Sequence, residues 1–157
     1  MDARQLLRHT LATVAYRGSK AIRDAPAGFA EFKVSAGSRT PAEILAHIGD
    51  LFDWALSIAQ NRRTWCDSKP RDWDQEIERF HAALAAFDAY LVSSEPLGAS
   101  AGKLFQGPVA DALTHVGQLT ILRRLAGAPI KGESYYDADI TVGAVGANQP
   151  RANKEFD

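Results

Sequence analysis

The chain has 157 residues, of which 46% are hydrophobic, enough for one well-buried core and too few for two comfortable domains. Its 18 basic and 19 acidic residues leave a net charge of −1, which excludes an electrostatic attraction to nucleic acid or to an anionic membrane as the basis of function. No run of about 18 apolar residues is present to span a membrane. We therefore expect one domain over residues 1–157, with small molecules or other proteins as its partners.

A single cysteine, Cys66, excludes an internal disulfide framework. The first residues, MDARQLLRHTLATVAYRG, lack the continuous apolar stretch of a signal peptide. Both observations predict a cytoplasmic protein. Cys66 falls in a polar loop expected over residues 62–72, and we interpret it as an incidental thiol.

Two amphipathic patterns predict helices over residues 2–23 and 73–92. In both, apolar side chains recur at spacings of three, four and seven, with polar residues between them. The apolar positions are Leu6, Leu7, Leu11, Val14, Ala15 and Ile22 in the first pattern and Ile77, Phe80, Leu84, Phe87 and Leu91 in the second. His81 falls away from the apolar stripe, so we interpret it, like His9, as a surface or boundary residue.

A capping box predicts a further helix over residues 41–61. Thr40 is followed by Pro41 and, three residues on, by Glu43, the usual signature of a helix start. His47 lies inside the apolar side of this helix, where a histidine is more often a hydrogen-bonded core residue than a ligand. Glu43 and Asp50 project to its flank and place carboxylates near the imidazole.

The stretch PVADALTHVGQLTILRRLA, residues 108–126, predicts a fourth helix with Pro108 at its first position, after a loop over residues 96–107. Asp111 and His115, four residues apart, then share a face that we expect to be buried. Burying a carboxylate beside an imidazole costs on the order of several kcal/mol unless an opposite charge offsets it. A divalent cation can provide that charge. In a second interpretation, Asp111 complements the helix dipole and His115 is hydrogen-bonded in the core.

The composition changes after residue 129. The segment is rich in glycine and short in helix formers, which predicts an irregular tail over residues 130–157 that packs on the bundle. The tail is also a candidate cover for an active site. We interpret Tyr135, Tyr136 and Asp137 as packing residues rather than as parts of such a site.

Two short segments connect these helices to a protein family. Glu43-Ile-Leu-Ala-His47-Ile-Gly-Asp50 and His115-Val-Gly-Gln118, followed by Leu122-Arg123, resemble the motifs of the DinB superfamily of small helical metal-binding proteins. The resemblance covers roughly residues 1–130 and implies an all-α fold, a four-helix bundle of DinB-like type with an irregular C-terminal tail. Val116 is a departure, since the family usually has arginine there.

The resemblance also implies a ligand set for a divalent metal. One histidine comes from the second helix and an H-x-x-x-H pair from the fourth, which correspond here to His47, Asp111 and His115. Asp111 stands where the family usually has histidine. Two histidines and a carboxylate remain an acceptable set for zinc, nickel or iron, with an open position for water or substrate. Asp50 and Gln118 are then candidates to orient the imidazoles or the bound water.

Relatives in this family include transferases and isomerases that use low-molecular-weight thiols such as mycothiol, bacillithiol or glutathione. The resemblance therefore implies a metal-dependent transferase with a thiol co-substrate, in which the metal lowers the pKa of a bound thiol or water. Two alternatives stay open. One is a metal-dependent hydrolase with Asp50 or Glu43 as base. The other is a non-catalytic dimerisation or stress-related bundle without metal, in which Asp111 and His115 form a buried hydrogen-bonded pair.

We also expect a homodimer. Helical bundles commonly associate through helix faces, and Trp54, Trp65 and Trp73 offer apolar contact surface. The sequence does not choose among the faces.

Overall fold

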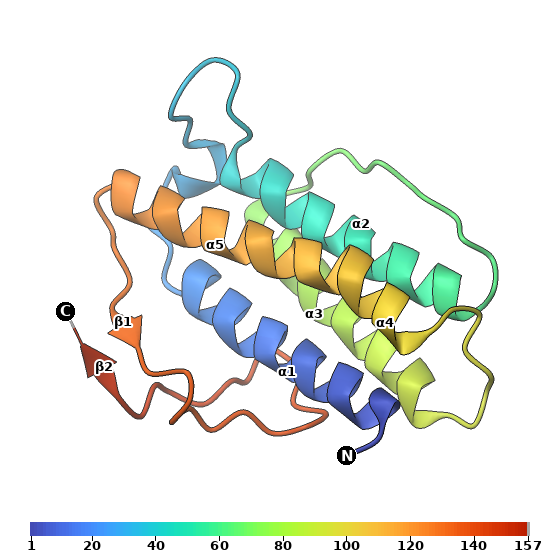
Figure 1. Cartoon of the computed structure of the whole chain (residues 1–157). Coiled ribbons are helices and arrows are strands. Elements are labelled where there is room, and N and C mark those ends of the chain that lie inside the picture. Colours follow the sequence, from blue (N-terminus) through green and yellow to red (C-terminus); the bar gives the residue numbers. More distant parts are fainter. Residues whose placement is uncertain (157) are drawn as a thin grey trace.

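The computed structural model describes residues 1–156, and within them four long helices form an all-α bundle (Figure 1). The helices are α1 (Ala3–Ile22), α2 (Pro41–Ala59), α3 (Trp73–Val92) and α5 (Ala110–Leu125). Helix α1 packs against α3 and α5, and α2 packs against the same two helices. The predicted four-helix bundle is confirmed.

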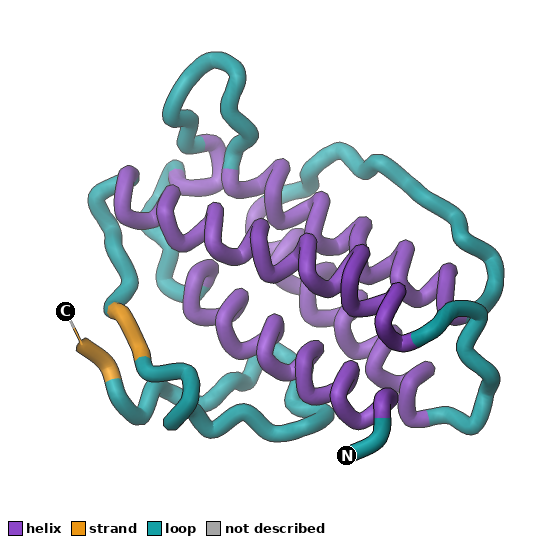
Figure 2. The backbone as a smooth tube through the Cα atoms, viewed as in Figure 1, coloured by secondary structure: helices purple, strands orange, loops and turns teal. Residues whose placement is uncertain are grey.

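After the end of α2, the chain runs back along the length of the bundle before α3 begins (Figure 1). These two helices run in the same direction, so the connection over residues 60–72 is a long loop (Figures 1 and 2). It lies along the outer side of α2. The loop therefore forms a rim beside the α2–α5 face.

Reciprocal capping boxes start the first two helices. The Asp2 side chain accepts a hydrogen bond from the Gln5 amide at 2.9 Å. The Thr40 hydroxyl accepts from the Glu43 amide at 3.1 Å, while the Thr40 amide donates to Glu43 Oε2 at 2.7 Å. Each box provides hydrogen bonds for two amides that have no partner inside the helix. The predicted start of α2 is confirmed.

The core lies between the four helices and is dominated by phenylalanine and branched aliphatic side chains. Fully buried apolar side chains include Phe52, Phe80, Phe87, Leu11, Leu45, Ile48, Leu84, Leu104 and Leu119. Burial of each such side chain contributes roughly 1.5–3 kcal/mol. Helices α1 and α3 approach closely at Gly18, where a Cβ atom would lie 2.6 Å from Phe80 Cζ.

The fourth helix begins earlier than Pro108, so the predicted start was wrong. Ser100 caps α4 (Ala101–Leu104), and the chain continues through a π-helical segment, η2 (Phe105–Val109), directly into α5. Pro108 lies inside this segment. Proline lacks an N–H and its ring crowds the preceding turn, and the wider π turn accommodates both without ending the helix.

The tail packs along α1, as expected of an irregular segment, and contains a small antiparallel pair, β1 (Gly132–Glu133) with β2 (Glu155–Phe156). Lys20 on α1 ties the pair to the bundle, because its Nζ lies 2.8 Å from a carboxylate oxygen of each strand. Tyr135 packs edge-on against Tyr16 on the same helix. The contacts of residues 130–156 given above are with α1, on the side of the bundle away from the α2–α5 face.

His81 is buried, contrary to its assignment as a surface or boundary residue. Its side of α3 is covered by the tail, and the residue is only 8% exposed. Its Nδ1 lies 3.1 Å from the Val145 carbonyl oxygen and its Nε2 lies 3.4 Å from Ser19 Oγ. The helical periodicity places His81 off the main core stripe correctly but carries no information about a distant segment that covers it.

Candidate metal centre

Two histidines meet on the face between α2 and α5. His47 lies two turns into α2, and His115 lies in the second turn of α5. Their ring centroids are 4.7 Å apart with the planes nearly perpendicular, at 86°. The His47 and His115 side chains are 17% and 12% exposed, so both rings are largely enclosed but reach the surface.

Asp111 faces both imidazoles. One carboxylate oxygen lies 3.5 Å from His115 Nε2 and the other lies 3.9 Å from His47 Nε2. The first contact follows from the spacing of four residues on α5, which stacks the two side chains on one face. The second joins two helices. The Asp111 side chain is 49% exposed, so the expectation that Asp111 is buried was wrong.

The spacing of these groups fits a divalent cation. The ligand atoms of His47, Asp111 and His115 all lie within 4.8 Å of one another. Zinc holds nitrogen and oxygen ligands at about 2.0–2.2 Å, which places neighbouring ligand atoms of a tetrahedral site roughly 3.3 Å apart. Small side-chain movements therefore convert the observed arrangement into a ligand set of two imidazoles and one carboxylate.

Gln118 orients one of the imidazoles. His115 Nδ1 lies 2.7 Å from Gln118 Oε1, and because an amide oxygen only accepts, the N–H of His115 is at Nδ1. This contact leaves Nε2, the atom that faces Asp111, as the ring nitrogen directed into the centre. A hydrogen bond to the far nitrogen is how proteins commonly fix the tautomer of a metal-binding histidine.

The environment keeps His47 neutral. Burial lowers the pKa of His47, and the neighbouring His115 and Arg39 lower it further, against the opposing effect of Asp111 and Asp50. A neutral imidazole is the form that binds a metal. At neutral pH the ring is therefore ready to act as a ligand without first losing a proton.

Asp50 holds the 60–72 loop in place. Its carboxylate accepts a hydrogen bond from the Ser68 amide at 2.9 Å and another from Arg79 Nη2 at 2.5 Å. Burial raises the pKa of Asp50, but these hydrogen bonds outweigh it and the pKa is lowered. Asp50 also forms, with His47 and Asp67, a second group whose ligand atoms all lie within 4.8 Å of one another. Its carboxylate, however, already accepts the hydrogen bonds from Ser68 and Arg79.

The loop also brings to the centre an aromatic side chain, Trp65, that no sequence pattern assigned to the site. The Trp65 ring packs edge-on against His47 at 5.6 Å and against Trp54 at 5.7 Å. Trp65 remains 44% exposed and so forms part of the wall around the histidines. It is separated from α2 by an irregular segment, and no periodic pattern relates it to His47.

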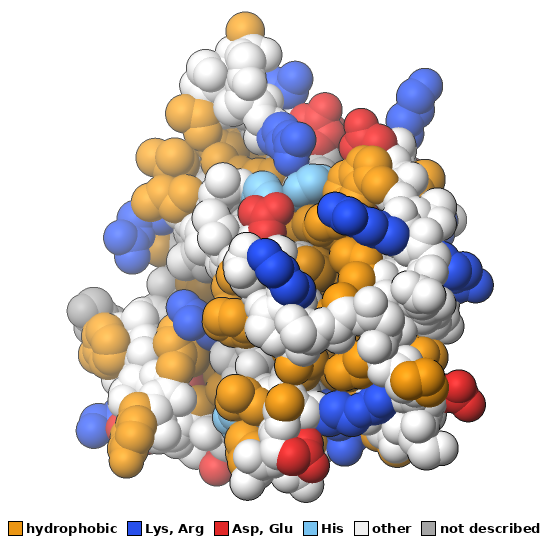
Figure 3. All heavy atoms as spheres, turned by 45° about the vertical axis from the view of Figure 1, so that its right-hand side comes forward, with side chains coloured by type: hydrophobic (Ala, Val, Ile, Leu, Met, Phe, Trp, Pro, Cys, Tyr) orange, Lys and Arg blue, Asp and Glu red, His pale blue; other side chains and the backbone are white. Residues whose placement is uncertain are grey.

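Two cavities open beside the centre, and Arg39 lines both. One, of about 350 Å³, is polar and lies between His47, Glu43 and the loop residues Asp67 and Lys69. The other, of about 400 Å³, reaches from His115 and Gln118 to apolar side chains, namely Ile44, Ile121 and Leu122. Figure 3 shows two histidine side chains at the surface beside an acidic side chain, with basic side chains close by.

Comparisons of the chain with protein-family models, with curated proteins and with solved structures gave no match. No helix within residues 1–156 has the length and apolar character needed to cross a membrane. The geometry of the α2–α5 face is therefore the observation from which a function can be inferred.

Proposed function

We propose that this protein binds a divalent metal ion through His47, Asp111 and His115. The observation that supports the proposal is the position of one carboxylate opposite two imidazole Nε2 atoms from different helices, with all three ligand atoms within 4.8 Å. A buried hydrogen-bonded pair, the competing interpretation, does not account for the exposure of Asp111 or for its separations of 3.5 and 3.9 Å from the two rings.

The second part of the proposal is membership of the DinB superfamily and a role as a metal-dependent transferase that uses a low-molecular-weight thiol. When bound, the cation would lower the pKa of a coordinated thiol and so present the thiolate as a nucleophile at neutral pH. The protein's own groups shape the access. Gln118 holds the His115 ring, Trp65 forms a wall beside His47, and the two cavities on either side of Arg39 admit a small molecule.

The hydrolase alternative has less support. It needs a carboxylate free to take a proton from water, and both carboxylates assigned to that task are engaged. The Glu43 carboxylate accepts from the Thr40 amide, which lowers the pKa of Glu43, and Asp50 accepts from Ser68 and Arg79. A base with a lowered pKa and a committed lone pair is a poor proton acceptor at neutral pH.

Elemental analysis of untagged protein, purified without added metal, tests the metal site. We expect near-stoichiometric zinc, nickel or iron in the parent, and loss of the metal in His47→Ala and in Asp111→Ala. Asp111→His restores a ligand and should restore binding. His9→Ala, on α1, is the matched control. Unchanged metal content in His47→Ala would show that these residues are not the ligands.

The thiol proposal has its own test. Addition of 2-mercaptoethanol or glutathione to the cobalt-substituted protein should produce a sulfur-to-cobalt charge-transfer absorption that is absent from His47→Ala. A cobalt-loaded protein that shows no such absorption with any thiol would retain the metal site and exclude the thiol chemistry.

A further inference from the structure

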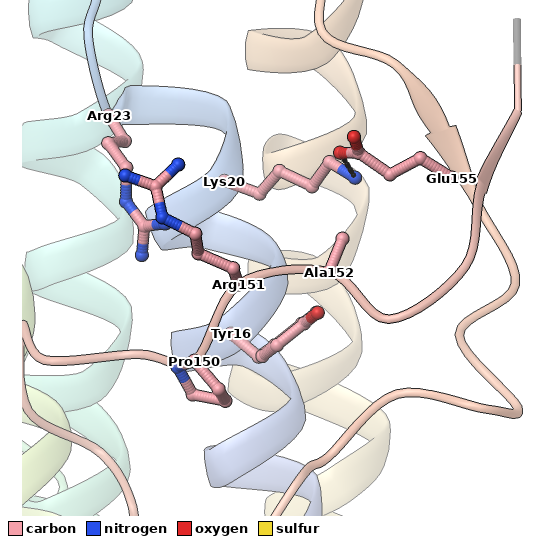
Figure 4. Close-up of a pocket in the computed structure, with 7 residues that line it drawn as sticks. All are labelled: Tyr16, Lys20, Arg23, Pro150, Arg151, Ala152 and Glu155. Carbon is pink, nitrogen blue, oxygen red and sulfur yellow. Dashed lines mark hydrogen bonds and ion pairs between the residues drawn. The ribbon is translucent and has the colours of Figure 1, made fainter.

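A further pocket, of about 190 Å³, lies between α1 and the tail, away from the α2–α5 face. Helix α1 and its C-cap residue contribute three lining residues, and the tail contributes the rest (Figure 4): Tyr16, Lys20, Arg23, Pro150, Arg151, Ala152 and Glu155. The two segments are far apart in the sequence. The pocket therefore exists only when the tail is docked on the bundle.

The carboxylates around this pocket already have partners. Lys20 Nζ lies 2.8 Å from an oxygen of Glu133 and 2.8 Å from an oxygen of Glu155. The Tyr16 hydroxyl donates to the other oxygen of Glu133 at 2.5 Å. The hydrogen bond from Lys20 lowers the pKa of Glu155. Glu155 is thus ionised and directed toward Lys20, as Figure 4 shows.

Within residues 1–156, the two guanidinium groups that line the pocket, those of Arg23 and Arg151, have no carboxylate partner. Arg23 donates to the Gln149 carbonyl oxygen at 3.2 Å, which steadies the side chain and leaves its other N–H groups available. The Arg151 side chain is exposed and makes no hydrogen bond or ion pair within residues 1–156. Both guanidinium groups line the pocket and lie at the same end of it in Figure 4. Two cations in one concave site repel each other unless an anion lies between them.

We propose that this pocket binds a small oxyanion, inorganic phosphate or a phosphate monoester, between Arg23 and Arg151. The planar fork of each guanidinium matches two phosphate oxygens, and such charge-assisted hydrogen bonds are stronger than neutral ones. Lys20, Arg23 and Arg151 together with Glu133 and Glu155 leave a local charge of +1, three cations less two carboxylates. A volume of 190 Å³ equals that of roughly six waters and holds the anion with part of its hydration.

An anion in this position would join the tail to α1. Arg23 belongs to the end of α1 and Arg151 to the tail, so a shared ligand adds a bridge between segments that close only in the folded state. Ligands that bind only the folded form raise its stability with concentration. The site thus couples oxyanion binding to docking of the tail.

Calorimetric titration of the full chain with inorganic phosphate at constant ionic strength tests the proposal. We expect saturable binding, a rise in the midpoint of thermal unfolding, and a loss of at least about tenfold in affinity in Arg151→Gln. Arg71→Gln, an exposed arginine on the 60–72 loop, should bind like the parent. His47→Ala should also keep the binding, which separates this pocket from phosphate attached to a metal.

Glycerol phosphate in a parallel titration distinguishes the two sources of the group. Tighter binding of the monoester assigns the pocket to a phosphorylated metabolite, and selective binding of inorganic phosphate assigns it to the free ion. Arg23→Gln can loosen the tail by losing its bond to Gln149, so Arg151→Gln, an exposed position, decides the outcome. Absence of saturable binding in the parent, or equal affinity in Arg151→Gln, would overturn the proposal.

Discussion

The two sides of the bundle use histidine in different ways. On the α1–α3 side, His81 is covered by the tail, and both of its ring nitrogens lie within hydrogen-bond distance of protein oxygen atoms. On the α2–α5 side, His47 and His115 reach the surface, and their Nε2 atoms face Asp111 at 3.9 and 3.5 Å, too far apart for strong hydrogen bonds.

The difference separates a structural histidine from a candidate ligand. A ring whose nitrogens are both engaged has no lone pair to offer, whereas a neutral ring with Nε2 directed at a carboxylate does. Whether a histidine is structural or a candidate ligand depends here on the segment that lies over it. The tail closes over His81, but on the other side the 60–72 loop forms only a rim and leaves the ligands accessible.

Removing the ion-pair partner of Asp50, the residue that holds that rim in place, should have the largest effect. In Arg79→Ala, the buried Asp50 carboxylate loses its cationic partner, and we expect the free energy of unfolding to fall by about 3–5 kcal/mol. Denaturant unfolding measures the loss. Arg71→Ala, at an exposed position on the 60–72 loop, should stay within about 0.5 kcal/mol of the parent. A small effect in Arg79→Ala would show that Asp50 does not depend on Arg79.

Truncation of the structural histidine should come next. His81→Ala removes a ring packed against Phe80 and leaves the Ser19 hydroxyl and the Val145 carbonyl without this partner. We expect a loss of about 2–4 kcal/mol in unfolding free energy, measured in urea, with unchanged metal content. A variant that instead lost its metal would contradict the division between the two sides.

In contrast to His81→Ala, Gln118→Ala should lower the affinity for metal. Without the hydrogen bond to Nδ1, the His115 ring can rotate and change tautomer, and metal affinity should fall by about 10–100-fold. Competition with a chromophoric chelator measures this affinity. Thr114→Ala, an exposed position one residue before His115, is the control and should bind metal like the parent. Equal affinity in both variants would remove Gln118 from the site.

The smallest expected effect is on the pH dependence of stability. Burial lowers the pKa of His81, against the raising effect of its bond to Val145. Below the ordinary value of about 6.5, the unfolded chain takes up a proton that the folded chain refuses, so stability is complete above that pH and decreases as the pH falls toward the folded pKa. Urea unfolding in the presence of a chelator should show this decrease in stability. In His81→Gln, the part of the decrease that comes from His81 should be absent. A parallel decrease in both proteins would exclude His81 as a source.

Local signals in the sequence were reliable for the helices. The capping box at Thr40 and Glu43 and the apolar periodicity of Trp73–Val92 both correspond to helices with these starts. Signals that depend on context failed. Pro108 is typical of a helix start, yet it lies inside a π-helical segment, because Ser100 caps the chain earlier and the next turn is wide enough for proline.

The candidate site was predicted in part. The spacing of Asp111 and His115 on one helix places them together, and the family resemblance added His47 from another helix. No pattern in the sequence indicated Trp65 or Arg39, which reach the centre from irregular segments. The same limit concealed the pocket between Arg23 and Arg151, which are separated by nearly the whole chain.

The sequence by itself determined the four helices, the irregular tail and the neighbouring positions of Asp111, His115 and Gln118, because these follow from interactions between residues a few positions apart. The tertiary structure alone decided which histidines are covered, how far Asp111 is exposed and which carboxylates are already paired. These properties depend on segments that meet only when the chain folds, and their burial and hydrogen bonding have no local signature.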